Sequence, residues 1–231
     1  IPPQHVNAGA FVLATTVPYM PKGSIHVGVV DPDVGTSRRG IVIVTHKQVF
    51  IGPDNGLLIP AARKFGLFKV FEISNESLFQ HPVSNTFHGR DIFSSVAGHL
   101  LMGISFDSIG QEIFDYVDLS FSQAIFSSDR IQAQILFVDD FGNLITNIEG
   151  NRFLQLFSDR NSLQIQTNDQ SLSSVFRRSY AFVENNELLV TIGSHGFVEI
   201  SMNQGRADSQ LGLSIDDKVS LIFENNEVYM N

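Results

Sequence analysis

The sequence predicts an α/β domain followed by an all-β domain, and the arrangement of its apolar segments carries that prediction. In the first half, short runs with strand character alternate with runs of helical period. In the second half, strand candidates follow one another with turn residues between them. A polar stretch over residues 120–130 is typical of a linker. We therefore expect domains over residues 1–125 and 131–231, with the boundary near Arg130.

The first domain opens with small apolar residues at Ala8–Thr16, which predict a short helix that Pro18 and Pro21 bring to an end. The apolar run Ser24–Val30 predicts a buried strand. The same reasoning predicts strands at Gly40–Val44, Val49–Ile51 and Lys69–Ile73, and helices at Leu57–Phe65 and Asp91–Met102.

The second domain is predicted to be a small barrel or a sandwich, because short apolar segments recur with turn signals and few helical patterns between them. The strand candidates are Ile131–Val138, Leu144–Ile148, Leu163–Thr167, Glu187–Ile192, Phe197–Ser201, Val219–Phe223 and Glu227–Met230.

Composition excludes several classes of protein. The chain is 43% hydrophobic and 17% charged, as globular proteins are, and its net charge of −9 argues against a nucleic-acid partner. The absence of Cys excludes disulfides, thiolate metal sites and Cys nucleophiles, and accords with a cytoplasmic protein. No apolar run approaches the roughly 18 residues of a spanning helix, and no signal peptide opens the chain, so we expect no membrane partner.

The loop after Ser24–Val30 is the first candidate site, because ligands of α/β sheets bind beyond the carboxyl ends of strands. It brings Asp31, Asp33, Arg38 and Arg39 close in sequence. A carboxylate beside a guanidinium stays ionised and can orient a small polar ligand. A salt-bridged turn exposed to solvent is the alternative.

Residues 85–91, Asn-Thr-Phe-His-Gly-Arg-Asp, form the second candidate, just before a predicted helix. His88 is suited to act as a general base, since the pKa of histidine lies near neutrality. The alternative is a structural His88, with Asp91 as a helix N-cap and Arg90 as a surface charge. The other histidines lack metal-ligand spacing, so we predict no metal site.

Two further candidates are turns between predicted strands. In residues 137–147, Asp139 and Asn143 flank a hairpin turn and either bind a ligand or only decorate the turn. The sequence Gly-Ser-His-Gly at residues 193–196 is the other turn. Phosphate-binding glycine motifs and the nucleophile elbow of serine hydrolases are missing from the sequence.

Taken in order, these segments resemble the S-adenosyl-L-methionine (SAM) hydroxide adenosyltransferase family, the adenosine-forming SAM hydrolases related to SAM-dependent fluorinase and chlorinase. The resemblance runs over essentially the whole chain. The motifs that carry it are Val-Val-Asp-Pro-Asp-Val-Gly-Thr-Ser-Arg-Arg (29–39), Gly-Pro-Asp-Asn-Gly-Leu-Leu (52–58), Thr-Phe-His-Gly-Arg-Asp (86–91), Asp-Phe-Gly-Asn-Leu-Ile-Thr-Asn (140–147) and Ser-His-Gly-Phe-Val-Glu-Ile (194–200).

The resemblance implies a Rossmann-like layered sheet with helices, followed by a C-terminal β-barrel. It implies a homotrimer that holds SAM between the N-terminal domain of one subunit and the C-terminal domain of its neighbour. The activity implied is hydrolysis of SAM to adenosine and L-methionine, by attack of activated water at C5′, with no cofactor. Because SAM is a sulfonium, methionine leaves as a neutral thioether and no general acid is required.

The resemblance also implies roles for particular residues. Water is activated by an Asp, an Arg and a His, which fall on Asp31, Arg38 and His88. Which of the three is the base stays open. The substrate-binding residues implied are Asp139 and Ser194 for the methionine amino and carboxylate groups, Asn143 for the adenine edge, Tyr180 for stacking, His195 beside the carboxylate, and the backbone around Met202 and Gln204.

The sequence departs from the family pattern at three places. Asp33 stands where Gly is usual, which predicts an unusual backbone or an added charge. His195 replaces the usual Arg, which predicts weaker carboxylate binding at high pH. The family's opening strand, with Thr-Thr-Asp-Phe-Gly, would precede Ile1, so we expect a truncated sheet and an incomplete ribose site.

Two other functions stay open. A SAM-dependent halogenase is one, because Gly89 leaves room for a halide, although Asp31, Arg38 and His88 together favour water. A non-catalytic SAM- or adenosine-binding module is the other.

Overall fold

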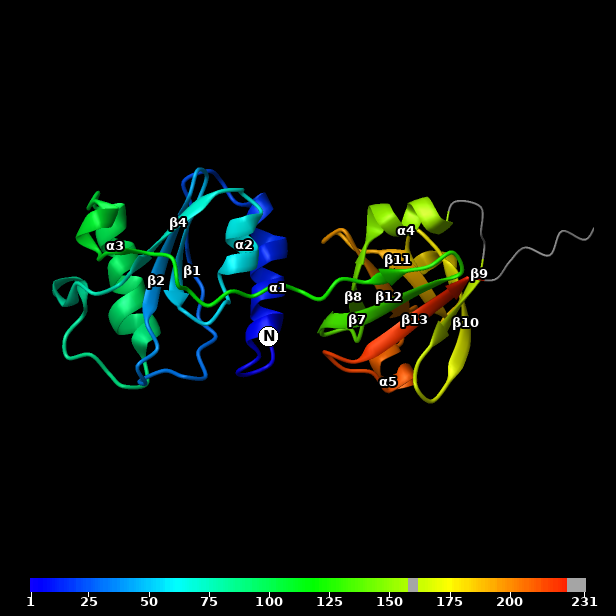
Figure 1. Ribbon diagram of the computed structural model, residues 1–231. Helices are drawn as coiled ribbons and strands as arrows, with labels where there is room; N and C mark the ends of the chain where they lie inside the picture. The colour runs from blue at the N-terminus through cyan, green and yellow to red at the C-terminus, as the bar shows by residue number, and fades with distance from the viewer. Residues whose placement is uncertain (158–161, 224–231) are drawn as a thin grey trace, which may run out of the picture. The chain divides into compact units, whose positions relative to one another are not determined.

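The computed structural model describes residues 1–157 and 162–223, and the chain divides into two compact units, Ile1–Ser120 and Phe121–Asn231 (Figure 1). The first unit is a sheet with helices and the second is a closed β-barrel. The predicted fold class is therefore confirmed.

The first unit is built on a five-stranded mixed sheet. Its strands, in the order in which they lie side by side, are β1 (Ile25–Val27), β3 (Val49–Pro53), β2 (Gly40–Thr45), β4 (Phe68–Glu72) and β5 (Glu112–Ile113). β1 and β3 run parallel and the other neighbours run antiparallel. Ile41, Val42 and Ile43 in β2 are all buried, because both faces of the sheet are covered, and this explains the continuous apolar runs in the sequence.

Helices cover the two faces of this sheet, as Figure 1 shows. α1 (Val6–Thr16) and α2 (Ile59–Arg63) lie on one side. A π-helical turn, η3 (Gly89–Ser94), leads into α3 (Ser95–Leu101) on the other. Single 3-10 turns are formed by η1 (Val17–Tyr19), η2 (Glu76–Leu78) and η4 (Phe106–Ser108).

One strand differs from its prediction. Ser24–Val30 was expected to be a buried strand, but β1 covers only Ile25–Val27 and pairs with β3 alone among the described strands. Val27 and Val29 are 39% and 45% exposed, because a strand at the edge of a sheet is covered by fewer neighbours. The apolar run was correct as a strand signal and wrong as a sign of burial.

The second unit is a seven-stranded barrel. Its strands, in spatial order, are β13 (Lys218–Phe223), β9 (Ser162–Gln166), β10 (Ser171–Phe176), β11 (Leu188–Ile192), β12 (Phe197–Met202), β8 (Leu144–Glu149) and β7 (Arg130–Val138). The pairing of β13 with β7 closes the ring, and a short strand, β6 (Ile125–Phe126), pairs with the start of β7. Closure removes the exposed edges that an open sheet would present.

Aromatic side chains fill much of the barrel core. Phe153 and Phe157, from α4 (Gly150–Phe157), stack with ring centroids 5.1 Å apart and pack against Phe176 and Phe223. The sequence did not predict α4, β10, α5 (Ala207–Leu211) or the 3-10 turn η5 (Tyr180–Phe182), all of which are short or rich in polar residues. The strand predicted at Glu227–Met230 lies outside the described residues.

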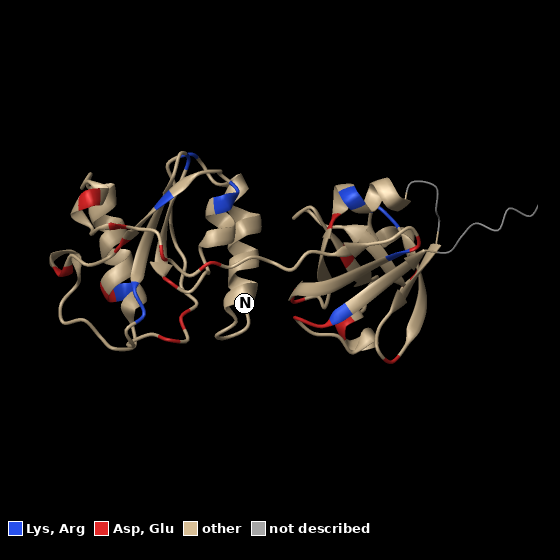
Figure 2. Ribbon diagram, viewed as in Figure 1, with Lys and Arg blue, Asp and Glu red and all other residues tan. Residues whose placement is uncertain are grey.

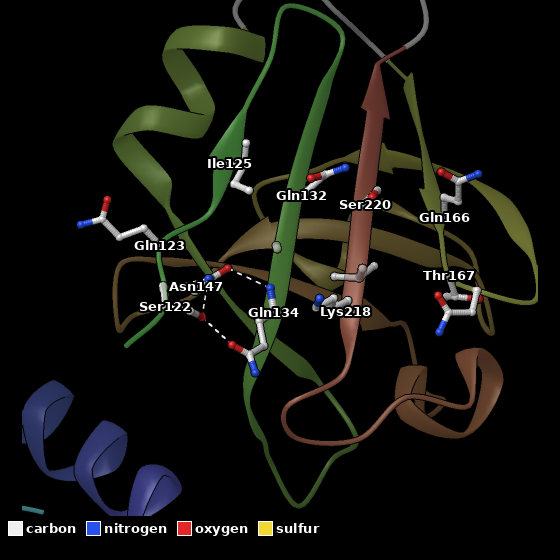
Figure 3. Close-up of a pocket in the computed structure, with 13 residues that line it drawn as sticks. Ser122, Gln123, Ile125, Gln132, Gln134, Asn147, Gln166, Thr167, Lys218 and Ser220 are labelled. Carbon is white, nitrogen blue, oxygen red and sulfur yellow. Dashed lines mark hydrogen bonds between the residues drawn. The ribbon is translucent and has the colours of Figure 1, made fainter. Parts of the chain in front are cut away.

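The predicted linker packs onto the barrel (Figure 3). Ser122 donates a hydrogen bond to the side chain of Gln134, and Asn147 Nδ2 donates to the carbonyl oxygen of Ser122 at 2.8 Å. These amides line a polar cavity of about 570 Å³ over β7 and β13. Because Lys218 is the one charged side chain that lines it, this cavity offers little catalytic chemistry.

The structure also shows where the charged residues lie and whether any described helix could cross a membrane. Lys and Arg residues lie in both units, among the Asp and Glu residues (Figure 2). Within residues 1–157 and 162–223, no helix has the length and apolar character needed to cross a membrane.

Candidate functional site

A buried ion pair lies at the start of the loop that follows β1. Arg38 donates from Nε to Asp31 Oδ1 at 3.1 Å and from Nη2 to Asp31 Oδ2. The two side chains are only 7% and 5% exposed. The pair is therefore a two-pronged contact held away from water, and the alternative of a solvent-exposed salt-bridged turn is wrong.

His88 joins this pair through the same guanidinium. Arg38 Nη2 lies 3.1 Å from His88 Nδ1. Because a guanidinium only donates, Nδ1 is the acceptor and the neutral ring carries its hydrogen on Nε2. Burial lowers the pKa of His88, and the charge of Arg38 lowers it further, against smaller opposing effects of Asp31 and Asp91. His88 is therefore neutral near pH 7.

The two loops that carry these residues approach closely at Gly35. This residue has φ +81°, and a Cβ placed on it would lie 2.3 Å from the carbonyl oxygen of Asn85. Only glycine fits such a contact, so Gly35 permits the loop of Asp31 to lie against the loop of His88.

Asp33 does not show the unusual backbone that the sequence predicted. Among the described residues, the non-glycine residues with positive φ are Gln4, Asn186, Gln204 and Asp216. The carbonyl oxygen of Asp33 accepts hydrogen bonds from the backbone N–H and the hydroxyl of Thr36, so the residue takes an ordinary place in a turn. Of the two alternatives for Asp33, the unusual backbone is therefore wrong, and the added negative charge near the site stays a prediction.

The π-helical turn η3 presents His88 at its start and fixes the preceding loop. Asp91 is 1% exposed and accepts hydrogen bonds from Arg90 Nε at 2.6 Å and from the backbone N–H of Ser84 at 2.8 Å. Phe93 is fully buried, and Arg38 Cζ lies 5.4 Å from the centre of its ring. Asp91 thus ties the loop rather than capping the helix, and Phe93 supports the guanidinium.

Neighbouring residues hold the loop from the other side. Asn55 Nδ2 donates to the carbonyl oxygen of Val30 at 2.8 Å, directly before Asp31. Arg39 instead contacts Asp54 and Asp115, at 2.8 and 3.0 Å. Arg39 is therefore a structural residue, and the predicted cluster reduces to Asp31 and Arg38, with His88 added by the fold.

Asp31 and His88 lie in the wall of a cavity of about 470 Å³. Val27, Val29, Val34, Thr86, Phe87, Gly89, Arg90 and Ser94 complete the lining. A Cβ at Gly89 would still be 3.6 Å from Val29, so this part of the cavity has space. An apolar cavity with a few convergent polar groups is typical of a site for a small molecule.

In the second unit, Asp139 and Asn143 form a closed turn. Asp139 Oδ1 accepts from the backbone N–H groups of Phe141 and Asn143, both at 2.9 Å. Asn143 Nδ2 donates to Asp139 Oδ2 at 2.8 Å, which leaves the amide oxygen of Asn143 as its acceptor. Asp140 is exposed, so Asp139 is the carboxylate that organises the turn.

Tyr180 and His195 meet at Glu199, a buried carboxylate that stands in the motif of residues 194–200 but was not predicted to be a site residue. The Tyr180 hydroxyl donates to Glu199 Oε1 at 2.6 Å, and His195 Nε2 lies 3.3 Å from Glu199 Oε2. Glu199 is 4% exposed, whereas Tyr180 is 41% exposed. Alternation along β12 makes Glu199 look like a solvent-facing residue, so its burial carries no local sequence signal.

The remaining predicted substrate residues lie close to this group in the chain. Ser194 is exposed in the turn between β11 and β12. Met202 ends β12, and Gln204 follows with φ +52° in a left-handed turn. Within the described residues, no group of three His, Asp or Glu side chains is arranged to hold a metal ion.

Comparison with known protein families gives two matches along the chain. Residues 1–110 match the SAM hydroxide adenosyltransferase N-terminal domain, and residues 133–220 match the C-terminal domain of the same family. The order of the two matches is the order of the two units.

Individual relatives agree with this result. The (R)-S-adenosyl-L-methionine hydrolase of Methanocaldococcus jannaschii is 33% identical over 96% of this chain and 80% of its own length. That of Salinispora tropica is 36% identical over 95% and 82%. An uncharacterised conserved protein from Thermotoga maritima has a solved structure with a TM-score of 0.90, at 33% identity over 96% and 86%.

More distant similarity extends to the halogenating relatives. A fluorinase of an Actinoplanes species is 22% identical over 63% of this chain and 58% of its own. The motifs indicated the SAM hydroxide adenosyltransferase family and a relation to fluorinase, and the comparisons confirm both. This chain belongs to the SAM hydroxide adenosyltransferase family.

Proposed function

We propose that this protein hydrolyses SAM to adenosine and L-methionine. The observation that carries the proposal is the buried pair of Asp31 and Arg38 with the half-buried His88 beside it, since Asp31 and His88 line a small cavity in a member of this family. The relatives named as (R)-SAM hydrolases, at 33% and 36% identity over nearly the whole chain, support the same activity.

The leaving group of this reaction is a neutral thioether, so the enzyme does not have to protonate it. A new bond forms between the oxygen of water and C5′, the C5′–S bond breaks, and its electron pair returns to sulfur as neutral methionine departs. The site must hold water in line with that bond, in a place from which bulk solvent is excluded, and accept one proton.

The geometry divides these tasks among the three residues. His88 has Nδ1 occupied by Arg38 and carries hydrogen on Nε2, so it donates to the water oxygen and orients it. Asp31 keeps carboxylate lone pairs beyond those that face Arg38, so it accepts the proton. Arg38 supplies positive charge where negative charge develops on the attacking oxygen.

The second unit supplies the substrate-binding residues in this proposal. Asp139 and Ser194 bind the methionine end, the free amide oxygen of Asn143 accepts from the adenine amino group, and Tyr180 stacks on the base. The backbone around Met202 and Gln204 lines the same subsite. His195 contributes through the turn that it stabilises, because both ring nitrogens lie within hydrogen-bonding distance of protein atoms.

We also propose a homotrimer, as the family resemblance implies. Light scattering coupled to size-exclusion chromatography is expected to give three times the mass of one chain. A monomer that hydrolyses SAM at full rate contradicts this part of the proposal.

A product assay tests the activity. The protein is incubated with SAM in buffers with and without chloride, and the products are separated by chromatography. Equal amounts of adenosine and methionine in both buffers are expected. Chloride-dependent formation of 5′-chloro-5′-deoxyadenosine would instead indicate a halogenase, and SAM binding without turnover would indicate a binding module.

A further inference from the structure

Glu199 is a buried carboxylate on the outer side of the barrel. Val198 and Ile200, its neighbours in β12, belong to the barrel core. Successive side chains of a strand point to opposite faces, so Glu199 and Ser201 point away from that core. They are nevertheless 4% and 0% exposed. An ionised group in such a place is costly unless its oxygens are hydrogen-bonded, so its partners matter.

Both oxygens of Glu199 have partners. Oε1 accepts from the Tyr180 hydroxyl at 2.6 Å and from Ser201 Oγ at 2.7 Å, and Oε2 faces His195 Nε2 at 3.3 Å. Burial alone would raise the pKa of Glu199, but the hydrogen bonds of His195, Tyr180 and Ser201 outweigh it and lower the pKa. The group is therefore an anion that three side chains surround.

The contact with His195 has a defined direction. The backbone N–H of Phe197 donates to His195 Nδ1 at 3.1 Å, so Nδ1 carries no hydrogen. Nε2 must then carry it and donate to Glu199. A Cβ on Gly193 would lie 2.3 Å from His195 Nε2 and 2.7 Å from Glu199 Oε2, so glycine is needed for the ring to reach the carboxylate.

We propose that Glu199 is a positioning residue of the SAM site, which holds Tyr180 with one carboxylate oxygen and His195 with the other. This inference rests on the proposed function, in which Tyr180 stacks on adenine and the turn of His195 carries Ser194. Tyr180 is tethered only at its hydroxyl among these contacts, and its half-exposed ring is thereby held ready for a base. Such preorganisation strengthens binding without acting on the reacting atoms.

The chain offers a variant for each arm of this contact. Glu199→Gln removes the negative charge and keeps only one acceptor oxygen, so the amide can no longer accept from His195 on one side and from Tyr180 and Ser201 on the other. Tyr180→Phe removes the other arm and leaves the carboxylate in place. Glu149→Gln is the matched control, because Glu149 is an exposed carboxylate at the end of β8.

Two kinds of measurement separate positioning from a purely structural role. Nitrogen-15 NMR of the histidine rings reports the tautomer of His195 without any ligand. Steady-state kinetics gives KM and kcat for SAM, and calorimetry gives the Kd for adenosine. Thermal unfolding of each variant shows whether it is folded under the assay conditions.

For Glu199→Gln we expect the Nε2 signal of His195 to shift, because its anionic acceptor is gone, and KM for SAM and Kd for adenosine to rise about tenfold, as the loss of one hydrogen bond to a charged group predicts. We expect kcat to stay within about threefold, since water is activated elsewhere. Tyr180→Phe should raise the Kd for adenosine by a similar factor and leave the tautomer unchanged. Glu149→Gln should match the wild type in every measurement.

Suppose that the wild type is active and that the Glu199→Gln variant is folded. The inference is then overturned if KM for SAM and Kd for adenosine are unchanged in the variant, whether or not kcat is reduced. If Glu199→Gln does not fold, Tyr180→Phe decides, and an unchanged Kd for adenosine contradicts the proposal. A wild-type protein that neither binds nor hydrolyses SAM refutes the proposed function itself, which is a separate result.

Discussion

Replacement of Arg38 by Lys tests whether the guanidinium acts as a connector or only as a positive charge. Arg38 contacts both oxygens of Asp31, Nδ1 of His88 and the carbonyl oxygen of Arg39. A lysine ammonium at this buried position keeps the charge, but it cannot span Asp31 and His88 together, because it is a single point on a flexible stem.

The size of the effect follows from those contacts. At least two hydrogen bonds that involve charged groups are lost, and each is worth about 1.5–3 kcal/mol. A loss of about 3–6 kcal/mol from the transition state corresponds to a fall in kcat/KM of about 10²–10⁴. Asp31 keeps a positive partner, so the free energy of unfolding should fall by less, about 1–3 kcal/mol.

The assay measures adenosine formed from SAM, with thermal unfolding as a check on folding. Arg39→Lys is the matched control, because Arg39 is the neighbouring arginine and pairs with Asp54 and Asp115 at 27% exposure of its side chain. The control should retain kcat/KM within a few fold. A folded Arg38→Lys variant whose kcat/KM lies within fivefold of the wild type refutes the reasoning.

Three further predictions concern the same cluster. His88→Ala should lower kcat by about 10² or more while the Kd for SAM changes little, and normal turnover would rule out the proposed role. The pKa of His88 lies below its ordinary value through burial and Arg38, and the neutral ring is the working form. As pH falls, kcat/KM should therefore stay constant through pH 6.5, the ordinary pKa of histidine, and decrease only at lower pH. A pH profile in which kcat/KM reaches half its plateau value above pH 7 would contradict this. Gly35→Ala should sharply reduce activity and destabilise the fold by about 1–3 kcal/mol in denaturant unfolding, because its Cβ meets the Asn85 carbonyl oxygen at 2.3 Å; wild-type stability and activity would contradict it.

The sequence predicted best the elements that are buried on both faces. Gly40–Val44 and Val49–Ile51 are apolar at almost every position, and they are the central strands β2 and β3. Some short elements of the second unit were missed for a physical reason. β10 is Ser-Leu-Ser-Ser-Val-Phe, in which Ser171 and Ser173 are exposed but Ser174 is buried, so its polar residues do not alternate as a strand pattern requires; α4 has only eight residues. Their stability comes from tertiary packing, which no local pattern records.

The candidate site was predictable to a different degree. Asp31 and Arg38 are seven residues apart, so a loop motif was enough to suggest their pairing. His88 is 50 residues from Arg38, and its place beside the guanidinium depends on the fold. The sequence therefore left the identity of the base open, and only the direction of the hydrogen bond to Nδ1 gave His88 a donor's role.

Residues that contact a ligand and residues that position them differ in how readily a sequence reveals them. Asp31 and Asn143 are visible as polar residues in glycine-containing loops, where a turn and a ligand site are the two ordinary reasons for such a group. Glu199 stands in an alternating strand, where a carboxylate ordinarily faces water. Its function is visible only when Tyr180 and His195 are seen to share it. Because the hydrogen-bonding capacity of a buried carboxylate must be met by several groups at once, Glu199 links the segment of Tyr180 to the motif of residues 194–200, and a motif that contains it does not by itself reveal that link.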